Sequence, residues 1–154
     1  MTIYADTSFL VASRYRRDTF HREAVRFFGE HEQDAWLWSP WHRVEVLHAL
    51  RQYTQHPEAK RALPIEDAKA LIHRLEADVR LGYLLHMEAD WHDVLRTANE
   101  LSAGLGFNLV FRGGDLLHVA YALELAAGLF VTFDGRQSAV AQAAGLKTEN
   151  LSEE

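Results

Sequence analysis

Short β-prone segments alternate with longer amphipathic segments along most of this sequence, and this alternation restricts the possible folds more than any other feature. The amphipathic segments carry apolar residues at helical spacing behind capping residues, which predicts helices. Strands that alternate with helices form parallel sheets with helices on both faces. The sequence therefore predicts an α/β fold, a three-layer α/β/α sandwich around a parallel sheet of four to five strands, at residues 2–5, 36–38, 82–86, 129–132 and, as an edge strand, 146–148.

The helices can be placed from the same pattern. Those that begin at Pro40 and Pro64 are expected to pair as a hairpin. A chain of 154 residues has the size of one domain, and residues 1–150 are predicted to form it. Residues 151–154 are predicted to be a frayed tail. The other helices are predicted to begin near Phe9, after Asp18, near Trp91, at Asp115 and near Arg136.

The composition excludes several classes of protein. A net charge of −6 argues against a protein that coats nucleic acid by bulk attraction, so any phosphate contact has to be local. The absence of cysteine excludes disulfide scaffolds, zinc ribbons and thiol nucleophiles. No apolar run approaches the roughly 18 residues of a membrane span, and no basic and apolar leader is recognisable. The chain is therefore expected to be cytoplasmic, without membrane contact.

Two acids are placed where ligands of open parallel sheets gather, beyond the carboxyl ends of strands, and a third is expected to point at the same edge. Asp6 follows the first strand, Asp134 follows the strand at 129–132, and Asp115 begins the helix that leads into that strand. Each has an ordinary explanation by itself: a helix cap for Asp6, a turn for Asp134 and a favourable helix-dipole charge for Asp115. Together, however, they are expected to emerge at one edge of the sheet.

Glu45 is a fourth acid, in an unusual position. It borders the stripe of Val44, Leu47 and Leu50, which is predicted to face the core. A carboxylate beside apolar surface is costly unless a positive group meets it, and the sequence offers no obvious basic partner. A divalent cation is the simplest explanation for four converging acids, and oxygen ligands without cysteine favour Mg²⁺ or Mn²⁺. Such ions promote the hydrolysis of phosphodiesters.

Four segments, taken together, resemble the signature regions of PIN-domain ribonucleases. Their order, spacing and placement on strands and helices carry the resemblance, which spans nearly the whole chain. Within that family the chain is most similar to VapC-type toxins of toxin–antitoxin modules. The resemblance implies an endoribonuclease that depends on Mg²⁺ or Mn²⁺, cuts single-stranded or structured RNA, forms a homodimer and is silenced by a cognate antitoxin. The segments are Ile3–Val11, the helical Glu45, Gly114–Leu123 and Val131–Asp134.

The resemblance also implies roles for individual residues. Thr132 matches a hydroxyl that often precedes the last acid of the family. Where the family frequently has a further acid, this chain has Arg136 and Gln137, which leaves the occupancy of a second metal site open. The residues that match metal-binding and catalytic acids are Asp6, Glu45, Asp115 and, at a more variable position, Asp134.

Substrate contacts are predicted around these acids. Ser8 could order a water molecule or a phosphate oxygen, or simply belong to the first helical turn. His118 shares a helix face with Asp115, and a structural hydrogen bond is favoured over a catalytic role. The other histidines are expected at the solvated surface. Arg112 and Arg136 are the first candidates for RNA phosphates, ahead of Arg14, Arg16 and Arg17.

Several alternatives stay open. Trp36, Trp38 and Trp41 are expected to pack in the core or in a dimer interface, although stacking on RNA bases is the other possibility. A phosphatase with an aspartyl nucleophile would want an acid two residues beyond Asp6, where this chain has Ser8. A catalytically silent PIN module that binds RNA or a protein partner, and an RNA-processing nuclease that is not a toxin, remain alternatives to the toxin.

Overall fold

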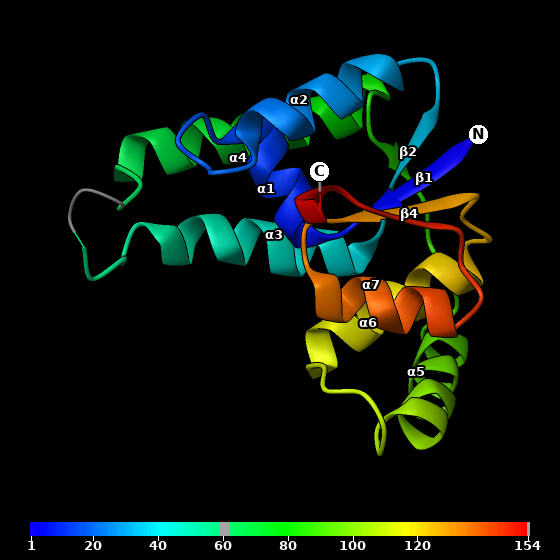
Figure 1. Ribbon diagram of the computed structural model, residues 1–154. Coiled ribbons are helices and arrows are strands. Elements are labelled where there is room, and N and C mark those ends of the chain that lie inside the picture. The colour runs from blue at the N-terminus through cyan, green and yellow to red at the C-terminus, as the bar shows by residue number, and fades with distance from the viewer. Residues whose placement is uncertain (59–61, 154) are drawn as a thin grey trace.

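The computed structural model of the protein describes residues 1–58 and 62–153. Within that part of the chain, the centre of the fold is a sheet of five strands in the order β3-β2-β1-β4-β5 (Figure 1). Every pair of neighbouring strands is parallel, as the alternation of strands and helices predicts. The strands are β1 (Thr2–Ala5), β2 (Ala35–Trp38), β3 (Leu85–His86), β4 (Leu129–Thr132) and β5 (Thr148–Asn150).

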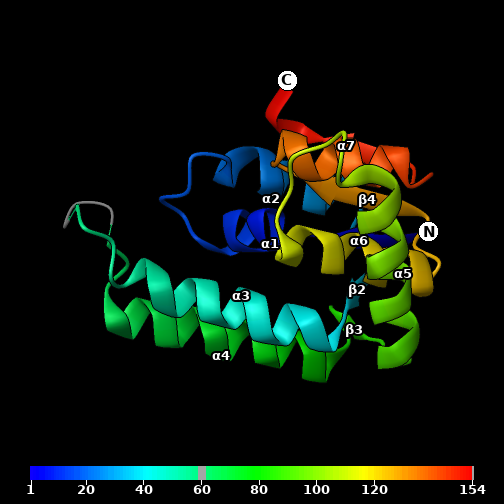
Figure 2. The ribbon, with the colours of Figure 1, turned by 90° about the horizontal axis from the view of Figure 1, so that it is seen from below.

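Helices cover both faces of this sheet (Figure 1). Helices α1, α2 and α4 lie on one side, and α5, α6 and α7 lie on the other. Helices α3 and α4 run side by side as the predicted hairpin and extend away from the sheet (Figure 2). The helices are α1 (Thr7–Arg14), α2 (His21–Glu30), α3 (Pro40–Tyr53), α4 (Ile65–Leu81), α5 (Trp91–Leu105), α6 (Gly113–Glu124) and α7 (Gly135–Ala143).

Two hydrophobic clusters fill the spaces between the three layers. Ile3 belongs to the cluster under α1 and α4, whereas Tyr4 belongs to the cluster under α6 and α7. Neighbouring residues of a strand point to opposite faces, so β1 contributes to both clusters. Trp36 and Trp38 are buried in the first cluster, where stacking on an RNA base is excluded. The predicted three-layer sandwich is confirmed.

Some predicted boundaries differ from the structure. The third strand contains only Leu85–His86, because α4 continues to Leu81 and ends at Gly82, whose φ is +81°. The fifth strand begins two residues later than predicted, after Gly145 at φ +88°. The predicted frayed tail contains a short 3₁₀ helix at Leu151–Glu153, with Leu151 buried. Glu154 lies outside the described residues.

The buried face of α3 corrects one prediction. Val44 is 60% exposed, and the buried positions are His42, Val46, Leu47 and Leu50. His42 can enter the core because its Nε2 lies 2.7 Å from the main-chain oxygen of Ala5 and its Nδ1 accepts from the main-chain nitrogen of Ser39 at 2.8 Å. The expectation that every histidine apart from His118 lies at the surface is therefore wrong for His42. None of the described helices is both long and apolar enough to cross a membrane.

Candidate active site

Asp6 caps α1 immediately after β1, and its carboxylate is almost completely buried. Its Oδ1 accepts hydrogen bonds from Ser8 Oγ at 2.7 Å and from the main-chain nitrogen of Phe9 at 3.0 Å. Its Oδ2 accepts from Thr132 Oγ1 at 2.8 Å. Burial raises the pKa of Asp6, although the nearby His118 and these hydrogen bonds act to lower it. Asp6 is therefore a helix cap, but a cap whose charge is costly where it lies.

The ends of β1 and β4 are tied together around Asp6. Thr132, the last residue of β4, also accepts a hydrogen bond from the main-chain nitrogen of Asp134 at 2.9 Å. Ser8 Oγ accepts from the main-chain nitrogen of Phe133 at 3.1 Å. These contacts place Ser8 and Thr132 beside the acid, so both have a structural role in holding it.

Asp134 lies at the same edge of the sheet and caps α7. Its Oδ1 accepts from the main-chain nitrogens of Arg136 at 2.8 Å and Gln137 at 3.4 Å. The guanidinium Nε of Arg136 lies 3.8 Å from the same oxygen. The turn and capping role that the sequence allows for Asp134 is thus present.

Asp115 lies in the first turn of α6 and is 7% exposed. Its Oδ2 accepts from the main-chain nitrogen of Arg112 at 3.1 Å, and Arg112 Nε lies 3.6 Å away. Gln137 Nε2 donates to the main-chain oxygen of Asp115 at 3.3 Å, and Gln137 Oε1 lies 3.5 Å from Thr132 Oγ1. Gln137 therefore bridges the surroundings of Asp115 and Asp6, a role that the sequence does not reveal.

Glu45 has the basic partner that the sequence does not identify. Its Oε2 accepts from Thr7 Oγ1 at 2.5 Å and is hydrogen-bonded to His118 Nε2. Burial acts to raise the pKa of Glu45, but the hydrogen bonds from His118 and Thr7 and the charge of His118 outweigh it and lower the pKa to about 2. Glu45 is therefore ionised at neutral pH, and the preference for a structural hydrogen bond at His118 agrees with the geometry.

A buried chain of polar groups leads from His118 into the core. Tyr4 Oη lies 3.0 Å from His118 Nδ1 and 3.3 Å from Ser39 Oγ, which in turn lies 3.0 Å from His42 Nδ1. The sequence does not reveal Tyr4 as part of the site, because it lies within an apolar strand. These contacts fix the ring of His118 and, through it, one oxygen of Glu45.

The donor set fits a hard divalent cation. Asp6, Glu45 and Asp115 supply carboxylate oxygens, which Mg²⁺ and Mn²⁺ prefer. Asp6 is 3% exposed, and the hydrogen bonds to its carboxylate within the described residues all come from neutral donors. As the side chains stand, residues 1–58 and 62–153 contain no group of three or more His, Asp or Glu arranged to hold an ion. Binding of an ion would therefore require some of the side chains at this edge of the sheet to move.

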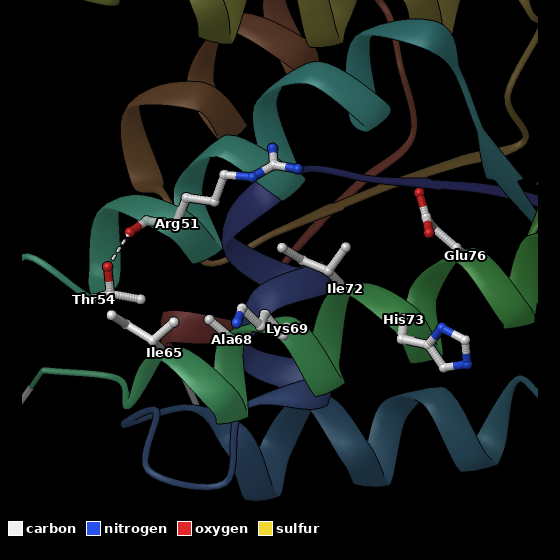
Figure 3. A pocket seen from close by; sticks show the side chains of 8 residues that line it. All are labelled: Arg51, Thr54, Ile65, Ala68, Lys69, Ile72, His73 and Glu76. Atoms are coloured by element: carbon white, nitrogen blue, oxygen red, sulfur yellow. Dashed lines mark hydrogen bonds between the residues drawn. The ribbon is translucent and has the colours of Figure 1, made fainter.

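Two cavities can be compared with this group of acids. One of about 370 Å³ is lined by Ser8, Phe133 and Asp134, with Asp18, Phe20, Tyr53 and Gly135. Of the four acids, its described lining includes Asp134, and Ser8 in the same lining is hydrogen-bonded to Asp6. A second cavity, of about 490 Å³, lies between α3 and α4, and its described lining includes none of the four acids (Figure 3). Of these two cavities, the first is thus the nearer to the acids.

The candidate phosphate-binding arginines differ in availability. Arg112 and Arg136 have largely exposed side chains beside Asp115 and Asp134. Arg14 is engaged elsewhere, because it forms an ion pair with Asp78 at 2.9 Å and its guanidinium lies 4.8 Å from the centre of the Phe28 ring. Arg112 and Arg136 therefore stay the first candidates, and Arg14 is a structural residue.

Comparisons with known proteins agree with this fold. The model of the PIN domain family matches residues 3–143. FitAcB from Neisseria gonorrhoeae has a TM-score of 0.70 at 14% identity, and the match covers 100% of both chains. VapC20 of Mycobacterium tuberculosis, described as a toxin that cleaves the sarcin–ricin loop, has a TM-score of 0.67 at 21% identity, over 94% of this chain and 95% of that one.

A third similar structure is VapBC2 from Rickettsia felis, solved with a DNA fragment from its promoter. It has a TM-score of 0.64 at 16% identity, over 97% of this chain and 98% of that one. No curated protein matches the chain in sequence. At identities this low, the TM-scores establish a common fold and nothing more.

Proposed function

Because the chain belongs to the PIN domain family, we propose that it is an endoribonuclease that depends on Mg²⁺ or Mn²⁺ and hydrolyses phosphodiester bonds in RNA. The observation that carries this proposal is the burial of two carboxylates, Asp6 and Asp115, near the edge of the sheet where β1 and β4 end. Thr132 and Gln137 connect the surroundings of the two acids through hydrogen bonds. Buried carboxylates destabilise a fold unless a positive charge meets them. A bound cation would offset that cost.

Asp6, Glu45 and Asp115 would hold the cation, and Asp134 would assist from the cap of α7. When bound, such an ion supplies a Lewis acid that stabilises negative charge on the phosphodiester and makes water a stronger nucleophile. Ser8 and Thr132 keep the Asp6 carboxylate in place through their hydroxyl groups.

RNA would enter through the cavity beside Ser8 and Asp134. Arg112 and Arg136, whose side chains are largely exposed, would bind its phosphates, since a guanidinium group binds a phosphate through two parallel hydrogen bonds. Their position at the first turns of α6 and α7 brings them next to the acids. The positive charge is thus local, as the overall charge of −6 requires.

We further propose that the protein is the toxin of a toxin–antitoxin pair, acts as a homodimer and is silenced by a cognate antitoxin. Support comes from the similar structures, which include the complexes FitAcB and VapBC2. Co-purification with the product of a neighbouring small gene would test the antitoxin. Light scattering of the protein alone would test the homodimer, which should have twice the 17.6 kDa of one chain. A monomer without such a partner would favour a nuclease outside toxin–antitoxin modules.

The test of catalysis is the substitution Asp115→Asn. We expect it to abolish Mg²⁺-dependent cleavage of a labelled single-stranded RNA, because a ligand charge is lost, while the melting temperature stays similar or rises. Retained cleavage would remove Asp115 from the catalytic residues. If the wild-type protein binds Mn²⁺ in calorimetry but cuts no RNA, the catalytically silent PIN module becomes the better explanation.

A further inference from the structure

The two oxygens of the Glu45 carboxylate have different surroundings. Oε2 is bound within the protein by Thr7 Oγ1 and His118 Nε2. Oε1 accepts no hydrogen bond from the described residues and faces Gly114 at the start of α6, next to Asp115. One oxygen therefore anchors the side chain, while the other stays available at the acidic site.

Gly114 leaves the space that Oε1 occupies. A Cβ atom at this position would lie 2.7 Å from Glu45 Oε1 and 3.7 Å from Trp41 Cζ2. Real Cβ atoms do not approach an oxygen so closely, so the carboxylate would have to move. The neighbouring Gly113 is different, because a Cβ there would meet nothing within 4 Å in the part of the chain that the structure describes.

His118 follows Gly114 by one helical turn and fixes the other side of the same carboxylate. Its Nε2 donates to Glu45 Oε2, and its Nδ1 lies 3.0 Å from Tyr4 Oη. Ring contacts with Tyr4 and Trp41, at 5.7 and 6.2 Å between centres, keep the imidazole in place. This is the arrangement in which outer groups orient a metal ligand.

We propose that Gly114 and His118 are positioning residues that act through Glu45: His118 holds Oε2 within the protein, and the missing side chain at Gly114 leaves Oε1 free to face the metal site. This rests on the proposed metal-dependent function. Helix α6 then has two roles at the metal site, since it supplies Asp115 as a ligand and also sets the position of Glu45, the ligand from α3.

The adjacent glycines provide a matched pair of variants, Gly114→Ala and Gly113→Ala. Both add one methyl group at the start of the same helix, where alanine does not weaken a helix. Binding of Mn²⁺ alone, without RNA, is measured by calorimetry and by electron paramagnetic resonance, beside the melting temperature. We expect Gly114→Ala to weaken Mn²⁺ binding by roughly 10-fold or more, the size of effect seen when groups that orient a ligand are changed. Gly113→Ala should stay within about twofold of the wild type.

The role of His118 is tested by removing its hydrogen-bond donor and then replacing it. His118→Leu removes the hydrogen bond to Glu45 and should weaken Mn²⁺ binding by roughly 10- to 100-fold. Glutamine places an amide N–H near the position of Nε2, so His118→Gln should recover part of that loss. Should either buried substitution unfold the protein, Tyr4→Phe weakens the same network more gently, with Tyr121→Phe as its control because Tyr121 lies outside this chain of hydrogen bonds.

The outcomes separate the two proposals. If Glu45→Gln weakens Mn²⁺ binding but Gly114→Ala behaves like Gly113→Ala, the positioning role of Gly114 is wrong and the metal site stands. If His118→Leu and His118→Gln bind Mn²⁺ equally, the hydrogen bond from His118 does not position Glu45. If the wild-type protein binds no Mn²⁺, or Glu45→Gln binds it as well as the wild type, both the metal role of Glu45 and this inference fail.

Discussion

Two buried histidines with different tasks show how much a single residue depends on its surroundings. His118 faces a carboxylate, whereas His42 faces a main-chain oxygen and a main-chain nitrogen. Burial, followed by the neighbouring His118, lowers the pKa of His42 to about 3. His42 is therefore neutral in the folded protein throughout the neutral range, and its Nε2–H donates to Ala5.

This state of His42 predicts a dependence of stability on pH. Its folded pKa lies below the unfolded value of about 6.5, so the unfolded chain takes up the proton first as the pH falls. The stabilisation is complete above the unfolded pKa and is lost between pH 6.5 and 3. Between pH 7 and pH 5 the free energy of unfolding should drop by about 2 kcal/mol from this residue.

Chemical denaturation at the two pH values measures that drop. His42→Gln keeps an N–H that can reach Ala5 but does not titrate, so the drop should shrink by most of that amount. The exposed His73 is the control, and His73→Gln should leave the drop unchanged. An equal drop in His42→Gln and in the wild type would contradict the assignment.

At the scale of elements, much of the fold could be predicted from the sequence. The alternation of strands and helices indicates the parallel sheet, and Ser39-Pro40 marks the start of α3, because these signals are local. The buried face of α3 could not be predicted, since it depends on the contacts of His42 with Ala5 of β1 and with Ser39, the cap of α3. The short β3 likewise depends on where α4 ends.

The candidate site, too, could be predicted only in part from the sequence. Asp6 and Asp134 could be predicted to share an edge, because each directly follows a strand of one parallel sheet. The contact of Glu45 with His118 joins α3 to α6 and depends on how these helices pack, and no spacing in the sequence encodes it. Gln137 and Tyr4 escaped prediction for the same reason.

The capping of α7 gives a prediction at this scale. Asp134 is at once a helix cap and a predicted metal-binding acid, and asparagine can replace only the first role. Asp134→Ala should lose about 1 kcal/mol of stability, whereas Asp134→Asn should stay within a few tenths of the wild type. Both should reduce RNA cleavage if the charge assists the metal. Full activity in the stable Asp134→Asn protein would leave Asp134 as a cap alone.

For the whole molecule, the acidic site is expected to lower the stability of the metal-free protein. Asp6 carries a charge that burial disfavours, and its pKa is raised, so its ionisation costs stability as the pH rises through the folded pKa. Asp6→Asn should therefore melt at the same temperature as the metal-free wild type or higher. A cation that binds only the folded protein should stabilise the wild type, by about 2.7 kcal/mol at 100 times its Kd.

Thermal unfolding with and without Mg²⁺ checks this coupling. The melting temperature of the wild type should rise with Mg²⁺, while that of Asp6→Asn should not respond. Buffer that contains a chelator and no added divalent cation gives the metal-free reference state. An equal rise in both proteins would mean that Mg²⁺ acts elsewhere on the molecule.

Cleavage of a labelled single-stranded RNA, followed across a Mn²⁺ titration beside calorimetric binding of Mn²⁺ to the same protein, tests most directly whether these acids form a catalytic metal site. We expect cleavage and binding to rise over the same range of concentration, and both to be lost in Asp115→Asn. Cleavage that persists in a chelator, or that survives the loss of Mn²⁺ binding, would contradict the proposed nuclease.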